Sequence, residues 1–216
     1  MLGSGVDVAT LIARLIVLLI AFTLHELAHA VTADYLGDPT PRNQGRITLN
    51  PLKHLDPIGT IMLLIAGFGW AKPVMVNPYN MRGNPHTSMA IVAAAGPFTN
   101  VLLAALAAML FRIGLVDPTF SSAGTLPSLN FLLTEFVWIN LILAFFNLIP
   151  VPPLDGYRIL MGLLPGDMGI RLRALERYGF ILLLALIFFL PMVGIDVLNW
   201  LVVAPSAAMF GVLAGI

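Results

Sequence analysis

The chain has 216 residues, of which 59% are hydrophobic and 10% are charged, and its mean hydropathy is +0.94. This composition excludes an ordinary soluble domain and leaves room for one compact membrane domain of about four to six spans, since each span needs about 20 apolar residues. A formal net charge of zero, without a basic block, argues against a nucleic-acid partner, and the absence of cysteine excludes disulfides and thiolate metal sites.

Apolar runs predict the helices in chain order. Val8–Leu36 is expected to be a retained span rather than a signal peptide, because no cleavage site of small residues follows its apolar part. Met89–Phe111 and Phe131–Pro150 are long enough to be two further spans. The run Ile58–Gly69 is too short to cross a bilayer and is expected to be a re-entrant or interfacial piece.

Two C-terminal apolar runs, Gly179–Leu190 and Met192–Ile216, are interrupted by Pro191 and Pro205, which leaves the number of spans there open. Residues 1–216 are expected to form a single membrane-embedded domain, with a core over about residues 8–160 and C-terminal membrane helices over about residues 179–216.

The connection between the first two long spans is rich in Pro, Gly and Asn and indicates loops, with Arg46–Asn50 and Ala71–Asn77 as short strands. The predicted fold is therefore an all-α polytopic membrane protein. It has a three-helix core, C-terminal membrane helices and a short β-hairpin-like segment between the first two core helices.

Basic residues lie mostly on one side of the membrane, provided that Ile58–Gly69 returns to the side from which it enters. The loops 37–87 and 151–178 then share that side and carry Arg42, Arg46, Lys53, Lys72, Arg82, Arg158, Arg171, Arg173 and Arg177. The positive-inside rule makes this side cytoplasmic and places the N-terminus outside.

The first long span contains His25-Glu26-Leu27-Ala28-His29, an H-E-x-x-H pattern. Two histidines at positions i and i+4 share one face of a helix and can converge on a Zn²⁺ ion, with Glu26 placed to take a proton from water. An alternative is that the histidines only hydrogen-bond between helices, although a carboxylate inside a span is costly without a function. At about 1.5 Å per residue, His25 lies about 26 Å from Val8, near the cytoplasmic face but inside the bilayer.

A catalytic zinc takes three protein ligands and leaves one position for water, so a third ligand is needed. His54 and Asp155 are the candidates, and Asp155 is the better placed. The span Phe131–Pro150 returns to the same face, and the prolines that follow break the helix where a carboxylate can turn inward.

These motifs resemble the site-2 protease family of intramembrane zinc metalloproteases. The resemblance runs from about Ala21 to Leu160 and rests on His25–His29, Ala95–Asn100 and the Asn147–Gly156 string that ends in Leu-Asp-Gly. It implies that His25, His29 and Asp155 bind one Zn²⁺ per chain, that Glu26 is the general acid/base, and that Asn147 lines the active site. The chain resembles a minimal member of the family, because it shows no PDZ or CBS domain and no span before the zinc helix.

The expected activity is hydrolysis of peptide bonds in membrane-spanning protein substrates, at the cytoplasmic side of a plasma or inner membrane. A helical substrate must unwind before it is cut, and Trp70–Asn77 is a candidate edge strand for the unwound chain, with Lys72 and Val74 alternating along it. A surface loop is the alternative for this stretch. His54 has several possible roles: orienting a ligand, donating to the oxyanion, or capping a turn.

Two other functions use the same residues without hydrolysis. A membrane zinc transporter would explain the histidines but not Glu26, and it would spread polar residues along a path through the bilayer. A client-binding scaffold without catalysis is the other alternative, and it is weakened because the expected catalytic residues are all present.

Overall fold

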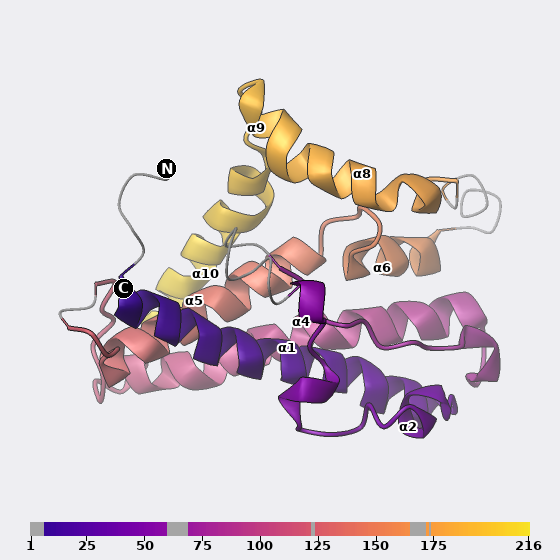
Figure 1. The fold of residues 1–216 in the computed structure, drawn as a ribbon, viewed down its shortest axis with the longest axis horizontal. Coiled ribbons are helices and arrows are strands. Elements are labelled where there is room, and N and C mark those ends of the chain that lie inside the picture. The colour runs from indigo at the N-terminus through magenta and orange to yellow at the C-terminus, as the bar shows by residue number, and fades with distance from the viewer. Residues whose placement is uncertain (1–6, 60–68, 122–123, 165–171, 173) are drawn as a thin grey trace.

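The computed structural model describes residues 7–59, 69–121, 124–164, 172 and 174–216, and three long helices lie side by side in it (Figure 1). They are α1 (Val8–Leu36), α4 (Pro85–Arg112) and α5 (Leu129–Asn147), and all three are long and apolar enough to cross a membrane. Helix α4 runs antiparallel to the other two. The three predicted core spans are thus present, and many of their large apolar side chains face outward, as expected for contact with lipid.

Each long helix begins at a polar capping residue. The side chains of Asp7, Asn84 and Ser128 accept hydrogen bonds from backbone N–H groups in the first turns of α1, α4 and α5. Helix α1 ends at Gly37, whose φ of 113° is the left-handed conformation that glycine adopts readily. The bounds of the spans therefore follow from local sequence signals.

Helices α1 and α4 each carry a stripe of buried residues that repeats every four positions, and the two helices pack against each other. The stripe on α1 consists of Ala9, Ala13, Val17, Ala21, His25, His29 and Ala33, and that on α4 of Val92, Gly96, Asn100, Ala104 and Ala108. Small side chains at this spacing allow two helix backbones to approach closely in a membrane. Both histidines of the H-E-x-x-H pattern belong to this stripe, so they face α4 rather than lipid.

Shorter elements connect the spans. Between α1 and α4 lie α2 (Thr40–Asn43), η1 (Pro51–Lys53) and η2 (Pro78–Asn80). After α5 comes α6 (Asp155–Leu163), which packs against α4. The short helix η3 (Glu176–Tyr178) leads into the C-terminal region.

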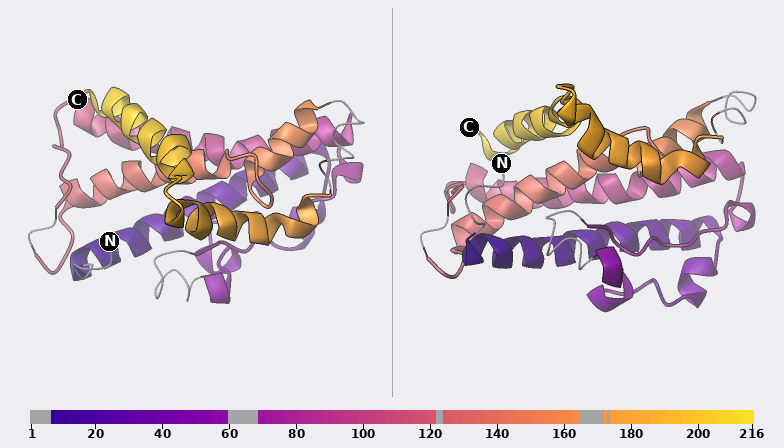
Figure 2. Two further views of the ribbon diagram at one scale, coloured as in Figure 1. Left: turned by 90° about the horizontal axis from the view of Figure 1, so that it is seen from above. Right: turned by 45° about the horizontal axis from the view of Figure 1, so that its top comes forward.

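The C-terminal region forms two helical arms that meet at a sharp turn (Figure 2). The first arm joins α8 (Gly179–Leu184), η4 (Ala185–Phe189) and α9 (Leu190–Met192), and the second joins η5 (Asn199–Val203) and α10 (Ala204–Ala214). Both η4 and η5 are π-helical, and each directly precedes the turn that contains Pro191 or Pro205. A wider π-turn accommodates a proline ring and its missing N–H, so the helices continue through both prolines.

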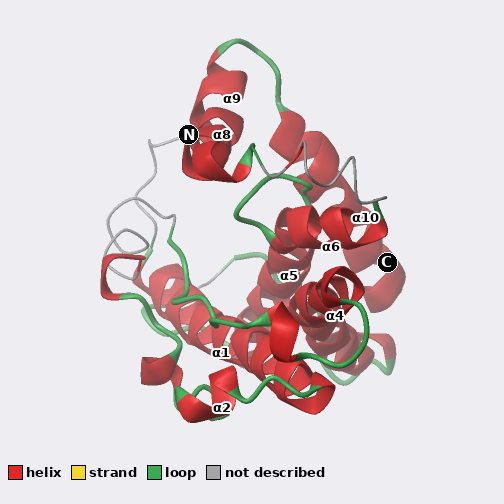
Figure 3. Ribbon diagram, turned by 90° about the vertical axis from the view of Figure 1, so that its right-hand side faces the viewer, coloured by secondary structure: helices red, strands yellow, loops and turns green. Residues whose placement is uncertain are grey.

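The predicted β-hairpin-like segment between the first two core helices is wrong for the residues that the structure describes. Helices and loops make up this part of the chain (Figure 3), and its only β-type pairing is an isolated antiparallel bridge between Leu55 and Ala71. The physical reason is that successive backbone N–H groups of the predicted strand bond to different partners. Lys72 donates to the His54 carbonyl, Pro73 has no N–H, and Val74 donates to a side chain of α1. Most of the predicted re-entrant run Ile58–Gly69 lies outside the described residues.

Two buried charged side chains hold this connecting segment against α1. Asp38 accepts the Asn77 backbone N–H at 2.6 Å and the Asn80 side-chain amide at 3.0 Å, besides two bonds from Thr40. Burial raises the pKa of the Asp38 carboxyl, but these hydrogen bonds outweigh it and hold the pKa below its ordinary value. Arg46 donates to the carbonyl oxygens of Lys53 and Lys72. Hydrogen bonds from these side chains thus replace the backbone hydrogen bonds that the predicted β-hairpin would have made.

Candidate active site

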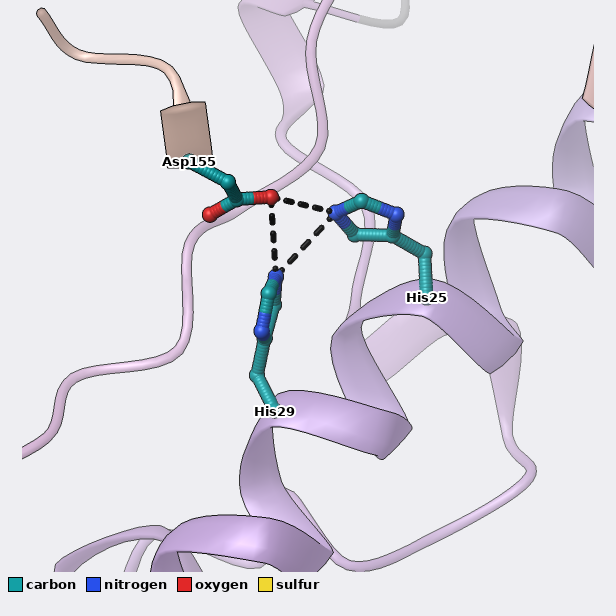
Figure 4. A group of neighbouring side chains, drawn as sticks. All are labelled: His25, His29 and Asp155. Carbon is teal, nitrogen blue, oxygen red and sulfur yellow. Dashed lines mark hydrogen bonds and ion pairs between the residues drawn. The ribbon is translucent and has the colours of Figure 1, made fainter. Parts of the chain in front are cut away.

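Three buried side chains converge where α1 meets the start of α6 (Figure 4). His25 Nε2 lies 3.1 Å from His29 Nε2 and 3.1 Å from Asp155 Oδ2, and His29 Nε2 lies 3.3 Å from the same oxygen. Within the described residues this is the only group of three or more His, Cys, Asp or Glu side chains close enough to hold a metal ion. The sequence predicted these three residues as the metal ligands, and the fold brings them together.

The donor set fits zinc. Four ligands about 2.0–2.1 Å from a tetrahedral Zn²⁺ lie about 3.3 Å from one another, close to the separations of these three atoms. His29 Nδ1 faces the Val92 carbonyl oxygen at 2.7 Å, and since a carbonyl only accepts, this nitrogen carries the proton and Nε2 presents a lone pair. A lone pair of His29 and a carboxylate oxygen of Asp155 that face each other require a proton or a cation between them.

Helix α4 leaves room for the two imidazoles at Gly96. A Cβ atom at this position would lie 2.5 Å from His29 Nε2 and 2.6 Å from His25 Nε2, closer than such contacts occur. The glycine of the Ala95–Asn100 motif is therefore needed for space between α1 and α4.

Asp155 is the first residue of α6, and the glycine after it explains how the carboxylate reaches the site. A Cβ atom at Gly156 would collide with the backbone carbonyl of Leu148, so only glycine permits α6 to begin this close to the end of α5. The sequence Leu-Asp-Gly thus combines a candidate ligand with the close backbone approach that positions it.

Glu26 is buried beside the three donors and is held by the connecting segment. Its Oε2 accepts the Val74 backbone N–H at 2.9 Å and lies 4.0 Å from the Arg46 guanidinium. Burial lowers the pKa of Arg46 by more than the nearby charge of Glu26 raises it. An arginine side chain nevertheless stays protonated in a protein. The Val74 N–H and the Arg46 guanidinium thus hold the Glu26 carboxylate from the side of the connecting segment.

The three donors and Glu26 face a cavity of about 480 Å³ between α1, the segment 69–74, α5, α6 and α8. Asn147 lines it, and its amide donates to the Leu143 carbonyl at 2.9 Å while its side-chain oxygen has no partner in the described chain. Arg158, one turn beyond Asp155 on α6, also lines the cavity and makes no hydrogen bond or ion pair with any described residue. The remaining lining is mostly apolar, which suits a segment of a membrane protein.

The other predicted site residues are placed differently. His54 is fully buried, and its Nε2 donates to the Thr48 carbonyl at 2.9 Å, but it is not among the residues that line the cavity. Val74 lines the cavity with a buried side chain, whereas Lys72 is exposed and does not line it.

Several residues around the site were not singled out for it from the sequence. Arg46 and Arg158 were counted only among the loop charges. Asn100 was named only as the end of the Ala95–Asn100 motif, and its Oδ1 lies 2.5 Å from His25 Nδ1. Its position four residues after Gly96, on the same face of α4, is a signal that could have placed it near His25. Nothing in the sequence indicated that α8 would cover the cavity with Phe180, Leu183 and Leu184.

A core of membrane helices with three buried donors that could hold a metal ion is the arrangement expected of a membrane metalloenzyme, and comparison with known proteins identifies the family. The chain is 43% identical over 171 residues to the protein named "Putative zinc metalloprotease YwhC" of Bacillus subtilis (strain 168), which covers 79% of this chain and 78% of that protein. The model of Peptidase family M50 matches residues 113–190. No solved structure matches this chain.

Two mycobacterial proteins, both named "Putative zinc metalloprotease Rip2", are also similar. That of Mycolicibacterium smegmatis is 30% identical over 172 residues, which is 78% of this chain and 64% of the relative. That of Mycobacterium tuberculosis (strain H37Rv) is 34% identical over 148 residues, which is 66% of this chain and 53% of the relative. The chain thus spans just over half to about two thirds of the length of these two relatives.

The chain belongs to peptidase family M50, the site-2 protease family. It is an intramembrane zinc metalloprotease that acts on membrane proteins in the bilayer, as the resemblance of its motifs implied.

Proposed function

We propose that His25, His29 and Asp155 bind the single zinc ion of this protease and that Glu26 is its general acid/base. The observation that carries the proposal is the convergence of three buried donors, 3.1–3.3 Å apart, at one end of a cavity that Glu26 also lines. Ligand nitrogens on successive turns of α1 and an oxygen from α6 leave one side of the group open to the cavity.

A zinc ion held by His25, His29 and Asp155 would supply Lewis acidity for the scissile carbonyl and would lower the pKa of a water molecule to about 7. The Glu26 carboxylate takes the proton from the attacking water and later passes it to the leaving amine. The Val74 N–H and Arg46 fix Glu26 in place, and the Asn147 amide faces the cavity where the substrate carbonyl would lie. The apolar lining and the residues of α8 would limit access of bulk water to the site.

The ligand set is tested by zinc analysis of purified protein in detergent. Wild type is expected to hold one zinc per chain, and His29→Ala and Asp155→Ala are each expected to hold only a small fraction and to cleave no single-span reporter. Two remaining donors bind zinc too weakly to retain it through purification. His86→Ala, which changes an exposed histidine at the start of α4, is the matched control and should keep its zinc. Retention of full zinc by both ligand variants would contradict the assignment.

We further propose that the segment around Lys72 and Val74 binds unwound substrate by strand addition. Because the Lys72 and Val74 N–H groups already donate within the protein, the substrate would pair with the opposite edge of this segment. There Met75 is 62% exposed, and its N–H has no partner among the described residues.

Met75→Pro removes that N–H and is expected to lower reporter cleavage about 3- to 10-fold, the value of one net hydrogen bond, without changing zinc content. Met75→Ala keeps the N–H and should cleave like wild type. Equal cleavage by the two variants would contradict strand addition. Val74→Pro is unsuitable, because it also removes the hydrogen bond to Glu26.

We also propose that the site lies toward the cytoplasm in the cell (plasma or inner) membrane, with the N-terminus outside. Two basic residues of the connecting segment support this orientation, because they lie at the C-terminal end of α1, the half of the helix that carries the histidines. Arg42 pairs with Asp34, and the Arg82 backbone N–H donates to the Leu36 carbonyl.

Single cysteines test the orientation directly, because the chain has none of its own. In intact spheroplasts, an impermeant maleimide should label Leu126→Cys, in the loop between α4 and α5, and should label Tyr79→Cys only after permeabilisation. These side chains are 71% and 80% exposed, so both are open to the reagent. The reverse labelling pattern would place the site on the outer side.

A further inference from the structure

A row of buried amides connects His25 to the backbone of α5. The Asn140 side-chain NH₂ donates to the Phe136 carbonyl at 2.8 Å, and the Asn100 NH₂ donates to Asn140 Oδ1 at 2.8 Å. Asn100 Oδ1 then lies 2.5 Å from His25 Nδ1. Asn100 and Asn140 are both fully buried, so no solvent competes for these bonds.

The direction of every bond in this row follows from its last member. A backbone carbonyl only accepts hydrogen bonds, so Asn140 must turn its NH₂ toward Phe136 and its oxygen toward Asn100. Asn100 must then donate to Asn140 and turn its own oxygen toward His25. An oxygen at that point accepts only if His25 Nδ1 carries the proton, which leaves the lone pair on Nε2, the atom that faces Asp155 and His29.

We infer that Asn100 and Asn140 act as positioning residues that fix the tautomer and ring orientation of His25 for zinc binding. Neither residue touches the cavity, and Asn140 acts only through Asn100. The inference rests on the proposed ligand set, because it concerns the nitrogen through which His25 would bind zinc. His29 needs no such row, since a carbonyl of α4, that of Val92, sets its tautomer directly.

Packing alone does not require this arrangement. The neighbouring positions of the two stripes are occupied by small apolar residues such as Ala21 and Ala104, which bring the helices together without polar atoms. The two amides, one on α4 and one on α5, instead serve to fix which atom of Asn100 faces His25 Nδ1.

Zinc affinity, measured by competition with a chelator in detergent, tests the inference without relying on proteolysis. Asn100→Leu is expected to weaken zinc binding about 10- to 100-fold, the usual effect of removing the partner of a metal-ligating histidine. Asn140 has no contact with His25, so Asn140→Leu should weaken zinc binding by a smaller factor. In this variant the Asn100 amide can rotate and exchange the positions of its oxygen and NH₂ group. The double variant, with both asparagines changed to leucine, should lose no more zinc affinity than Asn100→Leu alone, because Asn140 acts only through Asn100.

Two variants separate positioning from packing. Asn100→Asp keeps an acceptor at His25 Nδ1 and should bind zinc nearly as tightly as wild type. Thr134→Val removes another fully buried hydrogen-bonding group of α5, remote from His25, and should leave zinc affinity unchanged. If Asn140→Leu does not yield folded protein, as judged by thermal melting of the zinc-free form, Asn140→Ala takes its place.

Unchanged zinc affinity in Asn100→Leu, or equal losses in the Asn140 variant and Thr134→Val, would overturn the inference. His25→Ala distinguishes this from failure of the ligand set. If His25→Ala loses its zinc while Asn100→Leu keeps wild-type zinc affinity, only the inference about the two amides is wrong. If His25→Ala keeps its full zinc content, both the inference and the proposed ligand set are wrong.

Discussion

Glu26→Gln is expected to keep one zinc per chain and to cleave a single-span reporter about 10²- to 10⁴-fold more slowly than wild type, because a general acid/base contributes a factor of that size. The glutamine has the shape of the glutamate and retains an oxygen that accepts the Val74 N–H at the position of Oε2. It cannot take a proton from water at neutral pH. Zinc content and the initial rate of cleavage, measured on the same purified samples, check both parts of the expectation.

Glu135→Gln is the matched control. Glu135 is a buried carboxylate on α5, paired with Arg14 at 2.9 Å near the opposite ends of the spans, so its loss removes a charge without touching the site. We expect the control to retain zinc and to cleave at nearly the wild-type rate. If Glu26→Gln cleaved as fast as Glu135→Gln while both held zinc, another residue would have to be the base.

The core of the fold was predictable because each span carries its signals locally. Apolar length predicts Val8–Leu36, Met89–Phe111 and Phe131–Pro150, and the structure places helices over all three, with end positions that differ by no more than a few residues. The meeting of His25, His29 and Asp155 was also predictable, because helical spacing and the return of the third span determine where these side chains lie.

The connecting segment was not predictable, because side chains far apart in sequence organise it. Asp38 and Arg46 supply acceptors and donors to backbone groups around residues 53, 72 and 77, and these bonds replace the ladder that alternation around Lys72 and Val74 had suggested. The same limit applies to His54, since the sequence gives no information that its ring turns toward the Thr48 carbonyl. In the C-terminal arms, the prolines alone predicted interruption, and the π-turns that accommodate them depend on backbone geometry.

Gly96→Ala is expected to weaken zinc binding about 5- to 150-fold, the range that corresponds to an overpacking cost of about 1–3 kcal/mol. The added methyl group would lie 2.5 Å from His29 Nε2 and 2.6 Å from His25 Nε2. Without zinc, the imidazoles can turn away from the methyl group, but with zinc both rings must occupy the space that it fills. The strain therefore falls mainly on the zinc-bound form, and chelator competition measures it directly.

Ala104→Val is the control that separates this effect from general strain in α4. Ala104 lies two turns further along the same stripe and is fully buried against α5 and α10, so the larger side chain overpacks the helix interface away from the histidines. We expect Ala104→Val to lower the melting temperature while leaving zinc affinity near wild type. An equal loss of zinc affinity in both variants would mean that α4 supports the site only through its overall position. A selective loss in Gly96→Ala would mean that the missing side chain at Gly96 itself, rather than the overall position of α4, provides the room that the two imidazoles need.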